Sequence, residues 1–302
     1  MSKVSIIIPS RNEQFLSNTV DDIFKNARGD FEVIVVLDEK DQPLVPRPKL
    51  IVLKKEGRPG MKSAIIQGIK AASGDFVMKS DAHCMFGESF NTILAAECEP
   101  NWVVIPRRFS LEPSDWSIRQ HRPIVDYEYI PFPYLADLAS VKTGGKWHSK
   151  QIERATDPKY AIDDNMTFQG SVWFVSKAHF WKMGGFESTN TGDDFLLESE
   201  ELGNKTWLSG GRVVVNKKTW YAHLHKGAEY GRGYFMDKRP MKRQRIHHVD
   251  YWWHDRWPGA VHKFEWLIDK FMPIPGYPAD WKDPKYEANW RIVNGLEPMV
   301  TK

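Results

Sequence analysis

Two residues whose chemistry suits metal binding, Asp81 and His83, stand directly after an apolar segment that predicts a β-strand. Side chains alternate along an extended chain, so both project to the same side and can share one ion. A carboxylate with an imidazole suits Mn²⁺ and similar divalent ions, whose remaining positions can be filled by diphosphate oxygens and water. The spacing equally allows an aspartate that caps the turn into the next helix and a histidine in a loop. The pair is therefore a hypothesis that depends on its surroundings.

Two other pairs have side chains that could act beside such an ion. His223 and His225 follow another strand-like segment and alternate onto one side, so either could be a further ligand. Asp193 and Asp194 begin an acidic segment with helical spacing. Aspartate is favoured at a helix N-cap and in a first turn, so capping alone would explain them. Residue type and spacing leave these roles open.

The elements that have to position these side chains are short strands and helices in alternation. Apolar runs rich in β-branched residues predict strands, and helical spacing predicts the helices between them. Alternation with short connections predicts right-handed crossovers and a mostly parallel α/β sheet flanked by helices, whose ligands bind at the carboxyl ends of the strands. The predicted strands are 4–8, 31–37, 50–53, 76–79 and 102–105, and the predicted helices are 14–26, 61–72 and 88–99.

The pattern loosens after the first hundred residues. Residues 107–165 show no clear period and predict an irregular insertion on the acceptor side. Beyond it we expect strands at 172–175, 212–215 and 220–224, a short helix at 177–182, and an acidic helix at 193–202 that Gly203 ends. We expect residues 1–225 to form one domain and 226–302 a C-terminal extension or lid packed on it.

Composition argues against several classes of protein. The 302 residues have a net charge of +3, well short of the strongly basic surface of a general nucleic-acid binder. No apolar run approaches the roughly 18 to 20 residues that span a bilayer, and the run at 4–8 is too short for a signal-peptide core. Two cysteines build no disulfide framework and fit a reducing compartment. Together these features predict a cytoplasmic protein.

Several motifs together resemble a known family. The opening strand and turn VSIIIPSRNE at 4–13 and the segment RPGMKSA at 58–64, followed by Gly68 and the stretch 71–75, resemble family 2 glycosyltransferases, which have the GT-A fold. The Asp-x-His form at 81–83, followed by Cys84, is similar to that of polypeptide N-acetylgalactosaminyltransferases. The resemblance implies metal-dependent transfer of a hexose or N-acetylhexosamine from a nucleotide-sugar, expected to be a UDP-sugar, to an acceptor hydroxyl, with Mn²⁺ (or Mg²⁺) as cofactor.

The resemblance also implies roles for particular residues. His223 falls at the position of the family's third metal ligand, after Asp81 and His83. A positioned carboxylate takes the proton from the acceptor hydroxyl, and Asp194 is the first choice for this base, with Asp193 holding the acceptor. The residues implied on the donor side are Pro9, Arg11, Glu13, Asp38, Arg58, Lys62, Ser80 and Asp81.

The stereochemistry and the class of reaction have competing interpretations. Relatives with Asp-x-His retain the anomeric configuration, whereas the pair Asp193 and Asp194 resembles the inverting branch. Sugar-nucleotide nucleotidyl transfer is a rival, but it predicts a Gly-rich phosphate loop, and residues 9–13 contain no glycine. A nucleotide-sugar binder without turnover is the non-enzymatic alternative.

Residues 238–257 combine cationic side chains with Tyr and Trp rings. This mixture could bind nucleic acid, which would make a hydroxymethylated base in DNA the acceptor. It could also form a lid over the nucleotide-sugar, or a helix whose Trp face packs on the domain while its basic face stays in water. The sequence leaves the acceptor, the sugar and the oligomeric state open.

Overall fold

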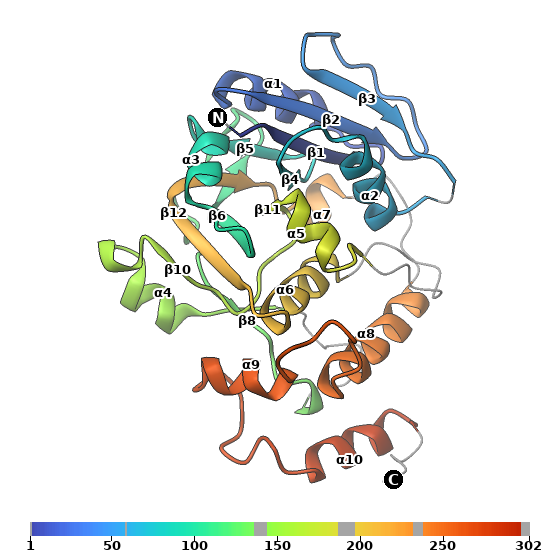
Figure 1. The fold of residues 1–302 in the computed structure, drawn as a ribbon, viewed down its shortest axis with the longest axis vertical. Helices are drawn as coiled ribbons and strands as arrows, with labels where there is room; N and C mark the ends of the chain where they lie inside the picture. The colour runs from blue at the N-terminus through green and yellow to red at the C-terminus, as the bar shows by residue number, and fades with distance from the viewer. Residues whose placement is uncertain (1, 58, 136–143, 187–196, 232–237, 297–302) are drawn as a thin grey trace.

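The computed structural model describes residues 2–57, 59–135, 144–186, 197–231 and 238–296 (Figure 1). Its centre is a ten-stranded sheet in the order β10-β12-β6-β11-β4-β1-β2-β3, with β5 paired to β12 and β7 paired to β6. Helices pack around this sheet, so the expected α/β class is confirmed. The eight strands of the main order are β1 (Val4–Ser10), β2 (Phe31–Leu37), β3 (Leu50–Lys54), β4 (Phe76–Ser80), β6 (Trp102–Glu112), β10 (Ile162–Asp164), β11 (Val172–Ser176) and β12 (Arg212–His223).

The N-terminal part of the sheet forms as the β-branched runs predict. Strands β3, β2, β1 and β4 are parallel neighbours, and β1 and β2 are buried almost throughout. Helices α1 (Leu16–Asn26) and α2 (Met61–Ala71) connect them. Gly68 lets α2 approach β1 closely, because a Cβ at this position would lie 2.4 Å from a methyl carbon of Ile7. A glycine inside a helix costs about 1 kcal/mol relative to alanine, and here the close packing explains it.

The sheet is mixed rather than purely parallel, but six of the eight strands of the main order run in one direction, as the expectation of a mostly parallel sheet requires. Strand β11 lies between β4 and β6 and is antiparallel to both, while β6 and β12 are parallel. The two strands predicted at 212–215 and 220–224 are one strand, β12, whose register shifts between Asn216 and Trp220. Such an irregularity bends a strand without ending it.

The segment predicted to be irregular, 107–165, contains several short elements. Strand β6 runs on to Glu112, and the remainder forms β7 (Ser117–Ile118), β8 (Glu128–Tyr129), β9 (Gly145–Lys146) and α4 (His148–Arg154) before β10. These pieces are too short for a period to be visible in the sequence. Elsewhere β5 (Cys84–Phe86), α3 (Phe90–Glu97) and α5 (Lys177–Lys182) complete the domain.

Helix α6 (Glu198–Leu208) does not end at Gly203 as predicted. All its residues are buried, and an ion pair of 2.8 Å joins Glu201 to Lys205 across the glycine. Trp207, in the last turn, is 1% exposed. Burial of the whole helix outweighs the low helix propensity of one glycine. The predicted start of this helix at Asp193 lies outside the described residues.

The C-terminal segment packs on α6. Its helices are α7 (Gly227–Tyr230), α8 (Lys238–Trp253), α9 (Phe264–Phe271) and α10 (Lys285–Val293). Helix α9 buries Phe264, Leu267, Ile268 and Phe271, which lie on one helical face. The rings of Phe271 and Trp207 are 5.4 Å apart, so α9 continues the core of the domain. In Figure 1 α8 and α9 lie beside α6, and α10 lies furthest from the sheet.

Candidate metal centre

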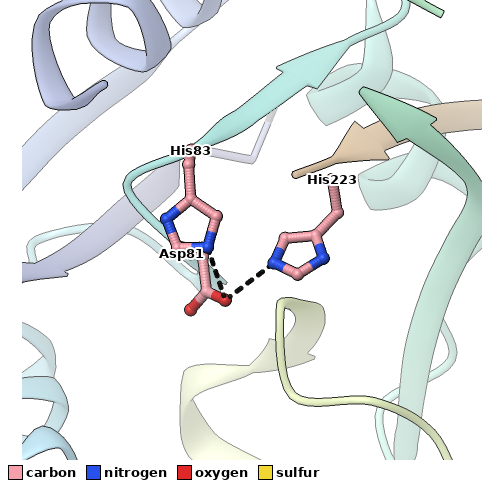
Figure 2. Close-up of side chains that lie close together, drawn as sticks. All are labelled: Asp81, His83 and His223. Atoms are coloured by element: carbon pink, nitrogen blue, oxygen red, sulfur yellow. Dashed lines mark ion pairs between the residues drawn. The ribbon is translucent and has the colours of Figure 1, made fainter. Parts of the chain in front are cut away.

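Three side chains named from the sequence, Asp81, His83 and His223, lie together at one edge of the sheet (Figure 2). Asp81 directly follows β4, His83 precedes β5, and His223 is the last residue of β12. Antiparallel pairing of β5 with β12 sets His223 opposite Cys84, next to His83. The local backbone is held by hydrogen bonds from the Asp81 N–H to the Ser171 carbonyl (2.7 Å) and from the Leu224 N–H to the His83 carbonyl (3.1 Å).

Helix α1 fixes the strand that follows His83. The hydroxyl oxygen of Thr19 accepts a hydrogen bond of 3.0 Å from the backbone N–H of Cys84, and Asp22 accepts one of 2.7 Å from that of Phe86. Both side chains face inward from α1 and are buried. Polar residues on the buried face of an otherwise amphipathic helix thus act as supports for the chain beside the candidate ligands.

The spacing of the ligand atoms suits a single ion. Asp81 Oδ2 lies 3.2 Å from His223 Nε2 and 3.7 Å from His83 Nε2. One ligand atom from each residue lies within 4.8 Å of the others. Within the described ranges this is the one such group of three found, and His225 is not part of it. One carboxylate and two imidazoles form a donor set for Mn²⁺ or a similar ion.

Burial keeps His223 in the form that can bind a metal. It is 5% exposed, and burial lowers its pKa to about 3, so the ring is neutral near neutral pH. Neither ring nitrogen of His223 makes a hydrogen bond to another described residue, although Nε2 has its ion-pair contact with Asp81. Buried nitrogens without partners are costly unless something occupies them. A divalent ion shared with Asp81 would remove that cost.

Glu13 orients the other imidazole. Its Oε2 lies 3.3 Å from Nδ1 of His83, on the ring side opposite the atom that faces Asp81. Glu13 also pairs with Lys226. Burial opposes ionisation of Glu13, but His83 and Lys226 outweigh burial and lower its pKa. A carboxylate on the second nitrogen of a ligating histidine fixes the ring and its tautomer. Glu13, expected on the donor side, thus lies beside His83, a candidate metal ligand.

A buried cation and a second carboxylate adjoin the three ligands, and neither was found from the sequence. Lys79 Nζ lies 2.5 Å from Asp81 Oδ1 and 3.4 Å from Glu198 Oε1. Burial opposes ionisation of Asp81, but Lys79, His223 and His83 together outweigh burial and lower the pKa of Asp81 far below its usual range. Burial raises the pKa of Glu198 to about 7. A lysine in an apolar strand, two residues before an aspartate, was the available signal, because fully buried lysines are rare unless paired.

Four of the residues expected on the donor side, Pro9, Arg11, Asp38 and Ser80, lie in or directly after strands β1, β2 and β4. Asp38 is buried and accepts a hydrogen bond of 3.1 Å from the Gly60 N–H, while its Oδ1 has no partner among the described residues. Burial raises the pKa of Asp38. Arg11 pairs with Glu39, and the Ser80 hydroxyl donates to the Asp81 carbonyl at 2.8 Å. Pro9 lies in β1 and is partly exposed.

Lys62 lies in a buried ion network that joins α2 to α6. Its Nζ is 2.9 Å from Glu201 Oε2, and the other oxygen of Glu201 is 2.8 Å from Lys205 Nζ. Lys62 is 5% exposed, so the network lies inside the protein. Three further residues expected at the site, Arg58, Asp193 and Asp194, lie outside the described residues.

The aromatic residues at 252–257 pack inward. Trp252 is 3% and Trp257 7% exposed, and Trp252 Nε1 donates to His248 Nδ1 at 3.1 Å. Rings buried in this way are not available to stack on a base. The packing interpretation therefore describes Trp252 and Trp257. No described helix is both long and apolar enough to cross a membrane.

Known proteins similar to this chain share one kind of domain. Residues 5–150 match the family model for glycosyl transferase family 2. Polypeptide N-acetylgalactosaminyltransferase 12 of Mus musculus is 24% identical over 262 residues, which cover 77% of this chain and 42% of the mouse protein. Polypeptide N-acetylgalactosaminyltransferase 16 of Homo sapiens is 24% identical over 241 residues, covering 74% of this chain and 40% of the human protein.

Solved structures give the same result at the level of the fold. The crystal structure of GalNAc-T7 with UDP, GalNAc and Mn²⁺ superposes with a TM-score of 0.65 at 14% identity, covering 98% of this chain and 55% of that one. Residues 1–349 of S. aureus TarS in complex with UDP-GlcNAc superpose with a TM-score of 0.54 at 15% identity, covering 88% and 69%. The chain spans less than half the length of the curated relatives it matches.

Proposed function

Because residues 5–150 match glycosyltransferase family 2 and the chain has the GT-A fold, we propose that it moves a hexose or N-acetylhexosamine from a UDP-sugar to an acceptor hydroxyl. The observation that supports this most is the cluster of Asp81, His83 and His223, in which the buried nitrogens of His223 make no hydrogen bond to a described residue. These three residues would hold Mn²⁺ or Mg²⁺. When bound, such an ion neutralises charge that develops on a diphosphate leaving group.

The position of Asp38 at the carboxyl end of β2 supports the proposal that the donor is a UDP-sugar. Asp38 follows β2, and its unpartnered Oδ1 could accept a hydrogen bond from the N–H of a uracil ring. Pro9 lies near the end of the neighbouring strand β1 and Arg11 directly follows it, so both would line the same nucleoside site. Arg58 stays a proposed contact to the base or diphosphate. Lys62 would act indirectly, by joining α2 to α6.

Acceptor activation remains assigned to Asp194, with Asp193 holding the acceptor. A sugar hydroxyl has a very high pKa and needs a positioned base as it attacks the anomeric carbon. Glu198, the first residue of α6, is a second carboxylate that could act here, since it lies beside Lys79 next to the metal ligands. Comparing Asp194→Asn, Asp193→Asn and Glu198→Gln for UDP release tests the assignment. Loss of turnover in Glu198→Gln alone would transfer the role of base to Glu198.

The experiment that tests the function is a mass-spectrometric screen of UDP-, GDP- and dTDP-sugars with Mn²⁺ and a panel of hydroxyl acceptors. The panel contains glycans, peptides and DNA with a hydroxymethylated pyrimidine, and NMR of the product gives the anomeric configuration. We expect a preference for UDP-sugars, loss of activity with EDTA, and severe loss in Asp81→Ala. Donor binding without turnover against every acceptor would instead indicate a nucleotide-sugar binder.

A further inference from the structure

Lys79 is a buried cation beside the candidate metal ligands. It is 1% exposed, and its ammonium contacts Asp81, Glu198 and the carbonyl of Gly170. The ammonium donates hydrogen bonds to Asp81 Oδ1 and to the Gly170 carbonyl, and Glu198 Oε1 lies 3.4 Å away as an ion-pair contact. The cost of burying the cation is thus offset by two carboxylates and one carbonyl.

The contact with Lys79 divides the two oxygens of Asp81. Oδ1 faces the lysine at 2.5 Å, while Oδ2 faces His223 at 3.2 Å and His83 at 3.7 Å. The carboxylate therefore presents a single oxygen toward the two imidazoles. A second oxygen could join the same ion only if the contact with Lys79 were broken.

Glu198 also packs closely against a glycine, Gly170. A Cβ at Gly170 would lie 2.2 Å from Glu198 Oε1, so the carboxylate occupies the space that any other residue at 170 would fill. Lys79 and Gly170 thereby fix Glu198, which is 5% exposed, next to the metal ligands. Glu198 begins α6, the helix that follows the segment with the proposed catalytic aspartates.

We propose that Lys79 is a positioning residue that restrains both carboxylates and limits how tightly the site binds a divalent ion. With Lys79 present, Asp81 offers one oxygen to the ion and Glu198 stays in contact with the lysine. With both carboxylates ionised, Lys79, Asp81 and Glu198 together have one net negative charge. Without it, both carboxylates are released toward the ion and the net charge becomes more negative by one unit. This inference rests on the metal site of the proposed function.

The test is a titration of the apoprotein with Mn²⁺ at pH 8, without nucleotide, in which electron paramagnetic resonance measures the free ion. The variants are Lys79→Met, Glu198→Gln and the double variant Lys79→Met/Glu198→Gln, whose net charge equals that of the wild type. One unit charge within a few ångströms of a divalent ion changes affinity by about tenfold even in a highly polar medium. We therefore expect Lys79→Met to bind about tenfold more tightly, Glu198→Gln about tenfold more weakly, and the double variant within about threefold of the wild type.

The order of affinities separates positioning from a merely structural role, because loss of structure would weaken Mn²⁺ binding in every variant. Binding by Lys79→Met that equals or is weaker than that of the wild type overturns the proposal. If circular dichroism shows that Lys79→Met is unfolded, Glu198→Gln and the double variant decide, since they differ only at residue 79 and the double variant must bind more tightly. Failure of the wild type to bind Mn²⁺ would instead refute the metal site itself, and with it the proposed function.

Discussion

Replacing Glu32 by glutamine should remove stability that depends on pH. Glu32, at the start of β2, is 6% exposed. Its Oε1 accepts hydrogen bonds from the Ser5 hydroxyl (2.6 Å) and the Ser73 N–H (2.7 Å), and its Oε2 lies 3.0 Å from the Lys3 ammonium. Burial opposes ionisation, but these donors outweigh burial and lower the pKa of Glu32 from 4.5 to about 2.

The magnitude follows from this change in pKa. Each pKa unit corresponds to about 1.4 kcal/mol, so the drop from 4.5 to about 2 in Glu32 corresponds to at most about 3.4 kcal/mol. Residual contact with water reduces this to about 2 to 3 kcal/mol. The pKa in the folded state lies below that of the unfolded state. The stabilisation is therefore complete above pH 4.5 and is lost as the pH falls toward about 2.

Urea unfolding of the wild type and Glu32→Gln at a series of pH values from 7 down to 3 measures this contribution. We expect a difference in unfolding free energy of about 2 to 3 kcal/mol at neutral pH that shrinks to less than half near pH 3. Glu99→Gln is the matched control, because Glu99 is exposed, and its curve should follow that of the wild type. A Glu32→Gln difference that stays constant across the series would refute the reasoning, since it would reflect packing alone.

Three other changes test the site and its supports. His223→Ala should weaken Mn²⁺ binding by more than about tenfold, because the site loses one of three candidate ligands, whereas His225→Ala should leave the affinity within about threefold of the wild type. Calorimetry measures both affinities, and equal losses would contradict the choice of His223 as the third ligand. Gly68→Ala should lower the free energy of unfolding by about 1 to 3 kcal/mol, since its Cβ would overlap the neighbouring strand. Lys70→Ala, on the exposed side of the same helix, is its control in urea unfolding, and similar values for both would argue against the close approach. Lys62→Met should lower the free energy of unfolding by about 3 kcal/mol, because it removes a buried partner of the Glu201 carboxylate on α6. A decrease below about 1 kcal/mol in thermal and urea unfolding would count against the ion network.

The mixed sheet explains why the second half of the chain was harder to predict. Strands β1 and β2 each contain a run of Ile or Val residues, so they were found with boundaries close to those observed. Strand β11 has the same kind of sequence, and nothing within Val172–Ser176 indicates that it runs antiparallel between β4 and β6. Strand direction depends on how the chain returns to the sheet, which local patterns do not contain.

What the sequence determined by itself was local in origin. Alternation along an extended chain put Asp81 and His83 on one side, and runs of Val and Ile specified strands β1 and β2. Only the tertiary structure decided what surrounds that pair. The pairing of β12 with β5 brings in His223, and the packing of α6 on β6 and β12 sets Glu198 beside Lys79. These contacts join residues far apart in the chain, and their geometry arises from burial and strand pairing, which act only once the chain has folded.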